Sequence, residues 1–457
     1  MITSNYDHTG RSSTINSTTP KHRQYTFYLQ VTKQVKLEGW TEKIMAMNNL
    51  MGIYFEDEEE YAFDKQFWEG ISEFMKVMST RSVEMEFFMC EGSSLSYSLH
   101  NVPLTSLGID IMDNFPEYTH YPKTLTQLAI NGTFGELVGL PDTLTQLDIM
   151  SKEWNHPIKP GTLPIGLKKL SFGYGFNQPI GKDTLPPSLE SLDFGVKFNQ
   201  PLTNIPKSVT KLCVDEAFQH PIDNQLLRKL SHKGVAVFAP GVAFPKLTKL
   251  VTEREDDKQV SLPSSTFPCL KTLSLRTMFR TWSESLDLSM SMTSSLRLLE
   301  IMAYGPITSF PQGIQKLRLI DSCEQSFVIT NTTLPRTLRS FSIRRYHHKF
   351  ESDHFPPALT SLKLIDIAQW PLPSQLPATL RSLRICCRES KWVKEHLETI
   401  LAMTSLDRIK LEANGHSFSL FRINDTLFLK YLYSVLGKFT ECEFIDIDGV
   451  LKKLRIK

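Results

Sequence analysis

Leucine and other apolar residues recur in a fixed pattern over much of the chain, with polar residues between them. The pattern is L-P-x-x-L-x-x-L-x-[FIL], as in L-P-I-G-L-K-K-L-S-F from Leu163 and L-P-P-S-L-E-S-L-D-F from Leu185. The alternation in its last part predicts a short β-strand that buries one face and exposes the other. Because a single strand cannot bury its apolar face alone, we expect the strands to stack.

The pattern repeats at steps of mostly about 19 to 24 residues, and about a dozen units fit between residues 102 and 411. Further copies start at Tyr121, Leu140, Ile205, Phe244, Phe267, Phe310, Leu334, Phe355 and Leu376. This period and the L-x-x-L-x-[FIL] core are typical of leucine-rich repeats. The predicted fold is an α/β-type leucine-rich-repeat-like solenoid, with a parallel β-sheet on its concave face and a largely irregular convex side.

A second motif follows the first in the central repeats. It reads F-N-Q-P-I from Phe176 and F-N-Q-P-L from Phe198, with W-N-H-P-I from Trp154 and F-Q-H-P-I from Phe218. The full unit closely resembles the FNIP repeat, a relative of the leucine-rich repeat. The units from Phe244 onward keep the L-P-x-x-L-x-x-L half and lose F-N-x-P. The resemblance covers about 290 residues, and about one third of them match strictly.

Two residue types of this second motif recur at the repeat period and should form columns in a stacked solenoid. The aromatic column is Trp154, Phe176, Phe198 and Phe218, and the amide column is Asn155, Asn177, Asn199 and Gln219. We expect the aromatic residues to fill the core behind the strands and the amides to satisfy buried backbone groups. A ligand-binding motif used in several copies is the alternative, and the structural interpretation is favoured.

The sequence divides into four parts. We predict a disordered N-terminus over residues 1–24, a mixed α/β N-terminal cap over 25–101, the repeat array over 102–390 and an α/β C-terminal cap over 391–457.

Hydrophobic spacing predicts the elements of the two caps. The N-terminal cap should contain strands over 25–32 and 82–89 and a helix over 63–78. The C-terminal cap should contain a helix over 392–403, a strand over 407–411, a second helix over 426–437 and a last strand over 443–448.

Charge and cysteine content exclude several classes of protein. The formal net charge of +2 gives no reason to expect a nucleic-acid partner. The seven cysteines are scattered without a C-x-x-C pair, so neither a zinc site nor a disulfide framework is indicated. The N-terminus lacks the apolar core of a signal peptide, and no run of about 18 apolar residues predicts a membrane span. We expect a monomeric protein of the cytoplasm.

Two groups of residues resemble catalytic or metal-binding motifs, but we assign neither role to them. Asp446 and Asp448 form a D-x-D pair that resembles the start of haloacid-dehalogenase-type phosphatases, but the large α/β domain that such a motif opens does not follow it. His347, His348, Asp353 and His354 lie between repeats, where polar loops are expected. We therefore predict no catalytic residue, metal or cofactor, and a protein that is not an enzyme.

The outward positions of the strands are the candidate partner-binding residues, because the concave sheet is the usual binding face of leucine-rich solenoids. They are Lys169, Ser191, Asp193, Lys316, Arg318, Lys363, Arg384, Arg408 and Lys410. Glu300 interrupts a series that becomes basic toward the C-terminus. A basic series suits an acidic partner surface, and a solvated face kept polar for solubility is the alternative.

The predicted function is non-enzymatic protein–protein interaction through the concave sheet, with a partner that the sequence does not identify. The resemblance to FNIP proteins raises an alternative, because some of them carry an N-terminal F-box and act as substrate receptors of ubiquitin ligases. No F-box opening is recognisable here, so this alternative requires a divergent F-box within residues 25–80.

Overall fold

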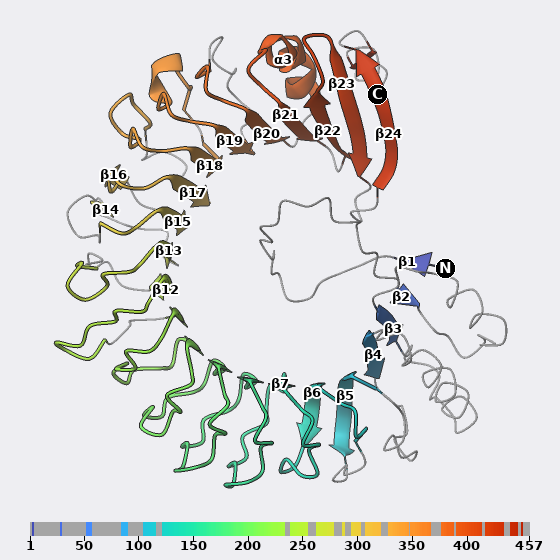
Figure 1. Cartoon of the computed structure of the whole chain (residues 1–457), viewed down its shortest axis with the longest axis vertical. Helices are drawn as coiled ribbons and strands as arrows, with labels where there is room; N and C mark the ends of the chain where they lie inside the picture. The colour runs from blue at the N-terminus through green and yellow to red at the C-terminus, as the bar shows by residue number, and fades with distance from the viewer. Residues whose placement is uncertain are drawn as a thin grey trace. The chain divides into compact units, whose positions relative to one another are not determined.

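The computed structural model describes the chain in segments. They are residues 2–3, 28–29, 52–56, 84–89, 104–115, 121–233, 238–254, 262–277, 286–287, 294–302, 307–320, 328–346, 348–366, 376–387, 390–413, 416–433, 439–446 and 449–450. The chain forms two compact units, Met1–Ile222 and Asp223–Lys457, and each is described by itself. In each unit the strands lie along the inner side of an arc and the turns along the outer side (Figure 1).

Unit 1 contains a parallel sheet whose strands follow chain order. Its members are β3 Gly52–Glu56, β4 Glu84–Met89, β5 Ser106–Phe115, β6 Gln127–Phe134, β7 Gln146–Ile149, β8 Lys169–Ser171, β9 Ser191–Asp193 and β10 Lys211–Val214. The short strands β1 Ile2–Thr3 and β2 Tyr28–Leu29 form a separate antiparallel pair. The sheet thus includes two strands that precede the first recognisable repeat at residue 102.

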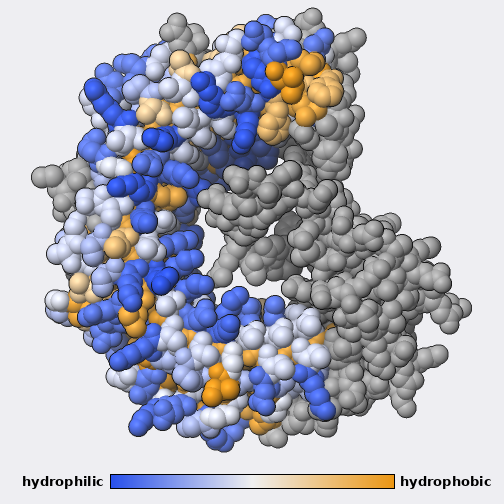
Figure 2. Space-filling view, in the orientation of Figure 1, coloured by the Kyte–Doolittle hydropathy of each residue, from blue (hydrophilic) through white to orange (hydrophobic). Residues whose placement is uncertain are grey.

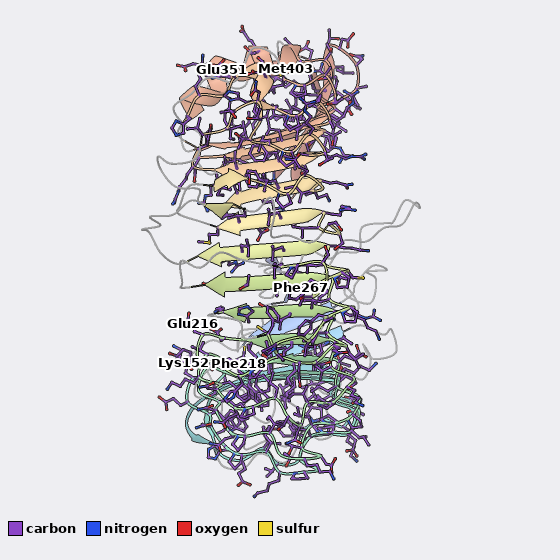
Figure 3. All side chains as sticks on the ribbon, turned by 90° about the vertical axis from the view of Figure 1, so that its left-hand side faces the viewer. Lys152, Glu216, Phe218, Phe267, Glu351 and Met403 are labelled. Carbon is purple, nitrogen blue, oxygen red and sulfur yellow. The ribbon has the colours of Figure 1, made fainter. Side chains whose placement is uncertain are left out.

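Unit 2 continues the same architecture. Its parallel strands are β11 Lys229–Lys233, β12 Lys249–Arg254, β13 Thr272–Thr277, β15 Leu298–Met302, β17 Lys316–Ile320, β18 Ser340–Arg344, β19 Ser361–Ile365, β20 Ser382–Cys387 and β21 Arg408–Ala413. Strands β14 Leu286–Asp287 and β16 Ile307–Ser309 pair apart from them, and a 3₁₀ turn, η1, covers Ser352–His354. Figure 3 shows strands of this unit side by side and pointing the same way.

The apolar positions of the repeat form the core, as the alternation predicts. In β7 and β19 every second residue is buried and the residues between them are partly exposed. The leucine before each strand is also fully buried, as at Leu167 and Leu359. Each such leucine removes its side chain from water only because the neighbouring repeats cover it. The predicted leucine-rich-repeat-like parallel solenoid is confirmed.

The proline of most repeats begins a tight turn rather than the strand itself. The carbonyl of Pro141 accepts a hydrogen bond from the backbone N–H of Leu144 at 3.0 Å, and the Pro186–Leu189 pair repeats this at 3.1 Å. The same contact occurs in unit 2 between Pro356 and Leu359 at 3.1 Å. Because the turn uses only the proline carbonyl, the missing proline N–H leaves no donor unpaired.

In several repeats a hydroxyl residue directly after L-P-x, and so just before the second leucine of L-P-x-x-L, links the repeat to the preceding one. Thr143 Oγ1 donates to the carbonyl of Leu125 at 2.7 Å, and Ser188 Oγ donates to the carbonyl of Leu167 at 2.8 Å. In unit 2, Thr379 Oγ1 makes the same bond to Leu359 at 2.8 Å. These hydroxyls satisfy carbonyls that the turn leaves outside the strand ladder.

Stacking in the central repeats of unit 1 is so close that it requires glycine after the strand. A Cβ atom at Gly195 would lie 1.8 Å from the carbonyl oxygen of Gly173, and one at Gly173 would lie 2.0 Å from the carbonyl oxygen of Ser151. No side chain fits at these distances. The F-G pair of the repeat is therefore a requirement of backbone contact.

The C-terminal cap differs from the sequence prediction in two elements, since strand β22, His416–Arg422, was not predicted and the second predicted helix is a strand. The predicted helix is confirmed as α3, Ser390–Ala402, and the last strand as β24, Phe439–Asp446. The second predicted helix is wrong, because residues Leu427–Tyr433 form strand β23, which pairs antiparallel with β22 and with β24. This apolar segment forms a strand because it hydrogen-bonds to an antiparallel strand on each side. The spacing of its own apolar residues does not reveal those neighbours.

The N-terminal cap is described only in part. The strand predicted over 82–89 is confirmed as β4, and the strand predicted over 25–32 contains the short β2. The predicted helix over 63–78 lies outside the described residues, as do most of residues 1–24 and of 25–80.

Candidate functional site

The aromatic residues of the FNIP-like motif stand in one buried column. Trp154, Phe176, Phe198 and Phe218 stack with centroid separations of 5.6, 6.0 and 6.1 Å and nearly parallel rings. The second aromatic residue of each repeat supports them, because Phe172 packs on Phe176 at 4.0 Å and Phe194 on Phe198 at 3.7 Å. These rings are core residues and offer no ligand-binding surface.

The amides of the same motif form a hydrogen-bonded ladder between repeats. Asn155 Oδ1 accepts the backbone N–H of Asn177 at 2.8 Å, and Asn177 Oδ1 accepts that of Asn199 at 2.8 Å. Asn199 Oδ1 then accepts the backbone N–H of Gln219 at 3.0 Å. Gln178 extends the ladder, donating Nε2 to the Asn155 carbonyl at 3.1 Å. The motif thus joins successive turns, which is a structural role.

In unit 1 the candidate residues lie on the exposed side of the sheet but do not make a charged cluster. Lys169 pairs with Ser191 across β8 and β9, and Asp193 is in register with Ser171. Lys169 Nζ donates to Gln146 Oε1 at 3.2 Å, and Gln146 Nε2 donates to Asp148 Oδ2 at 2.6 Å. The face is polar and of mixed charge.

In unit 2 the candidate residues come together in two rows across β17–β21. One row is Lys316, Ser340, Ser361, Ser382 and Arg408, and the other is Arg318, Ser342, Lys363, Arg384 and Lys410. Six of these ten residues are Lys or Arg and the other four are Ser, and none is buried. Neighbouring strands are about 4.8 Å apart, so Lys363, Arg384 and Lys410, which lie on consecutive strands of the second row, stand close together. We call these ten residues the basic surface.

One carboxylate borders the basic surface at β21. Glu412 Oε1 accepts from Arg384 Nη2 and from Lys410 Nζ, each at 2.7 Å, and its other oxygen accepts the Cys386 thiol. Desolvation would raise the pKa of Glu412, but the hydrogen bonds from Cys386, Lys410 and Arg384 outweigh it and lower the pKa to about 2. Burial, together with the bond to Glu412, raises the pKa of the Cys386 thiol to about 11.

The opposite border of the basic surface has a weaker ion pair. Arg318 Nη1 lies 3.3 Å from Glu300 Oε2, and the arginine side chain is 57% exposed, compared with 38% for Arg384. Ser274 also donates to Glu300 Oε1 at 3.1 Å. Exposed pairs contribute little, so Arg318 remains accessible to a partner.

Between these borders Lys363 forms no direct ion pair with a described residue, and the charge of Glu412 acts on it only from farther away. Among the described residues no hydrogen bond or ion pair involves Lys363, although Arg384 is its neighbour on the next strand. Desolvation, and then the charge of Arg384, lower the pKa of Lys363. A half-buried ammonium beside another cation is unfavourable unless an anion joins it.

The first row ends in apolar residues on the antiparallel strands. Arg408 is in register with Phe421, which pairs with Leu429, and Leu429 pairs with Phe444. The side chains of Phe421 and Phe444 are 37% and 69% exposed, and the Arg408 guanidinium lies 5.9 Å from the Phe421 ring centre. Figure 2 shows a largely hydrophilic surface with an apolar patch over the C-terminal strands of unit 2.

The other candidate sites gain no support from the described residues. His354 Nδ1 accepts the backbone N–H of Glu351 at 3.2 Å, and His347 lies outside the described residues. In the described part of the chain no three His, Cys, Asp or Glu residues gather as metal ligands. Asp446 Oδ1 accepts the backbone N–H of Gly449 at 2.7 Å, a turn contact, and Asp448 is not described. None of the described helices is both long and apolar enough to cross a membrane.

Sequence reasoning identified the cations of the basic surface but missed Glu412. The alternation of R-I-K-L-E-A places Glu412 two residues after Lys410 on the same side of β21. Extending that strand by one more period would have revealed the carboxylate.

Comparison with known proteins agrees with the repeat pattern. The family described as "FNIP Repeat" matches residues 154–197. A solved structure described as "CroV588 a novel circular LRR protein structure" aligns with 80% of this chain at 18% identity and a TM-score of 0.46, and the chain covers 60% of that structure's length. No curated protein matches the chain.

Proposed function

Because the chain carries FNIP repeats in a leucine-rich-repeat-like solenoid, we propose that it is a non-enzymatic scaffold that binds a protein partner on the exposed face of its parallel sheet. One contrast supports this proposal. The residues of the core, turn and amide ladder are used in stacking, whereas the ten residues of the basic surface are polar and not buried. Repeat proteins of this architecture typically bind through such a face.

Blocking the face tests the proposal. Tryptophan at Ser342 and Ser361 would fill the basic surface without touching the core, since both side chains point away from it. The control carries tryptophan at Thr332 and Ala378, which are exposed turn positions. Tagged full-length chains would be purified from their own cells and the bound proteins quantified by mass spectrometry.

We expect the face variant to lose a specific protein that the wild type and the control retain. Equal recovery in all three samples, or no specific protein in any, would contradict the proposal. Recovery of a ubiquitin-ligase adaptor and cullin would favour the F-box alternative, which stays a prediction because most of residues 25–80 lie outside the described part. A cytoplasmic location likewise stays a prediction.

A further inference from the structure

The basic surface also points to the chemistry of the partner, an inference that rests on the proposed function. We propose that it binds an acidic peptide segment, with Lys363 and Arg384 holding a side-chain carboxylate and Glu412 competing for the same cations.

The first argument is that Lys363 makes no direct ion pair among the described residues. Lys363 and Arg384 are adjacent in one row. Glu412 forms a direct ion pair with Arg384, whereas its charge acts on Lys363 only from farther away. A carboxylate from a partner would neutralise the ammonium and offset its repulsion from the guanidinium. Charge-assisted hydrogen bonds of this kind are the stronger ones.

The second argument is that the cluster already holds a carboxylate of its own chain. Glu412 lies 2.7 Å from nitrogen atoms of both Arg384 and Lys410, so these cations accommodate a carboxylate in a partly buried setting. A partner carboxylate at Lys363 would share Arg384 with Glu412. Removing the Glu412 charge should therefore free Arg384 and Lys410 and strengthen binding of the partner.

The third argument distinguishes an acidic peptide from a nucleic acid. Glu300 and Glu412 stand at opposite borders of the basic surface, and both would repel a continuous phosphate backbone. Separate carboxylates on a peptide can lie between these borders, where Ser340, Ser361 and Ser382 add hydroxyl donors.

A defined probe tests the inference with the full-length protein. A short fluorescein-labelled oligoglutamate peptide would be titrated at low and at physiological salt, with fluorescence anisotropy as the readout. The test variants are Glu412→Gln, Lys363→Gln and Lys363→Arg. The matched controls are Glu351→Gln and Lys349→Gln, which make the same charge changes at an exposed ion pair 3.0 Å long outside the sheet. Circular dichroism would establish that each variant is folded.

We expect Glu412→Gln to bind the probe about three- to tenfold more tightly and Lys363→Gln about tenfold more weakly. Lys363→Arg should retain binding, and both controls should stay within about twofold of the wild type. Binding should weaken as salt rises.

Three results would overturn the inference. One is an equal effect of Glu412→Gln and Glu351→Gln, which would show that net charge alone acts. Another is tighter binding of a single-stranded oligonucleotide of matched charge, which would make the ligand a nucleic acid. The third is that the folded chain does not bind oligoglutamate, while tryptophan at Ser342 and Ser361 still abolishes binding of the cellular partner. The face would then bind a protein, but not through an acidic segment.

Discussion

At the scale of single residues, the repeat sequence is explained by contacts between successive turns. Three residues of the repeat contact the preceding repeat. They are the glycine after the strand, the asparagine of F-N-x-P and the hydroxyl residue before the second leucine of L-P-x-x-L. None of these residues is required by its own strand. Their recurrence in the sequence is therefore explained by the stacking of repeats.

Replacing Gly195 by alanine should destabilise the protein by about 1–3 kcal/mol, because the new Cβ would lie 1.8 Å from the Gly173 carbonyl oxygen and the backbone must shift. Gly135→Ala is the control, since nothing lies within 4 Å of a Cβ there. Urea unfolding would measure both. Equal free energies of unfolding for the two variants would show that the repeats are not in close backbone contact.

Glu412 should make stability depend on pH in the acid range. Its pKa is about 2 in the folded protein and 4.5 when unperturbed, so its contribution is complete above about pH 4.5 and is lost as pH falls toward 2. Between about pH 6 and pH 3, wild-type stability should fall more than that of Glu412→Gln. Urea unfolding at both pH values measures the difference, and parallel losses would refute the assigned pKa.

The same carboxylate affects how the basic surface should be tested. Reversing the charge of Arg384 or Lys410 would place a carboxylate against Glu412 and destabilise the cap. Loss of binding in such a variant would not separate recognition from folding. Neutral substitutions at Lys363, which forms no direct ion pair with a described carboxylate, avoid this difficulty.

At the scale of elements, the sequence predicted what depends on local period and missed what depends on distant pairing. Leu147 and Ile149 alternate with polar residues, and this alone identifies β7 and its buried face. Residues Leu427–Tyr433 carry a similar apolar density, but β22 and β24 make them a strand. The cations of the basic surface were predictable because they occupy the alternate strand positions that face outward. The pairing of Glu412 with Arg384 was not, because it joins side chains on two different strands.

The C-terminal end of helix α3 depends on one arginine from the adjoining strand. Arg422 Nη2 donates to the carbonyls of Leu401 and Met403 at 2.8 and 3.2 Å, and its Nε donates to Leu406 at 2.9 Å. Carbonyls at a helix end lack partners within the helix, so this side chain provides them.

Arg422→Met should lose these hydrogen bonds and the contact of the guanidinium with the Phe428 ring, lowering stability by about 1–3 kcal/mol. Amide hydrogen exchange in α3 should accelerate, and Arg336→Met, at an exposed turn position, should leave it unchanged. Unaltered exchange in the Arg422 variant would mean that the helix end is satisfied in another way.

At the scale of the whole molecule, each unit combines a uniform interior with a face whose charge is not uniform. The described face of unit 1 mixes Lys169 with Asp148 and Asp193, whereas the basic surface of unit 2 gathers six cations and four serines. The residues used in stacking recur because each repeat packs against a repeat of the same structure. Face residues differ from repeat to repeat, and the proposed partner would account for that difference.

Site-specific photocross-linking tests the central claim most directly. A photoreactive residue would be placed at Ser361 or Ser382 on the basic surface, and at Thr332 or Ala378 in exposed turns, in the full-length chain in its own cells. We predict that the two surface positions cross-link one protein through an acidic segment and that the turn positions do not. Cross-links to that protein from the turn positions alone would contradict the assignment of the sheet as the binding face.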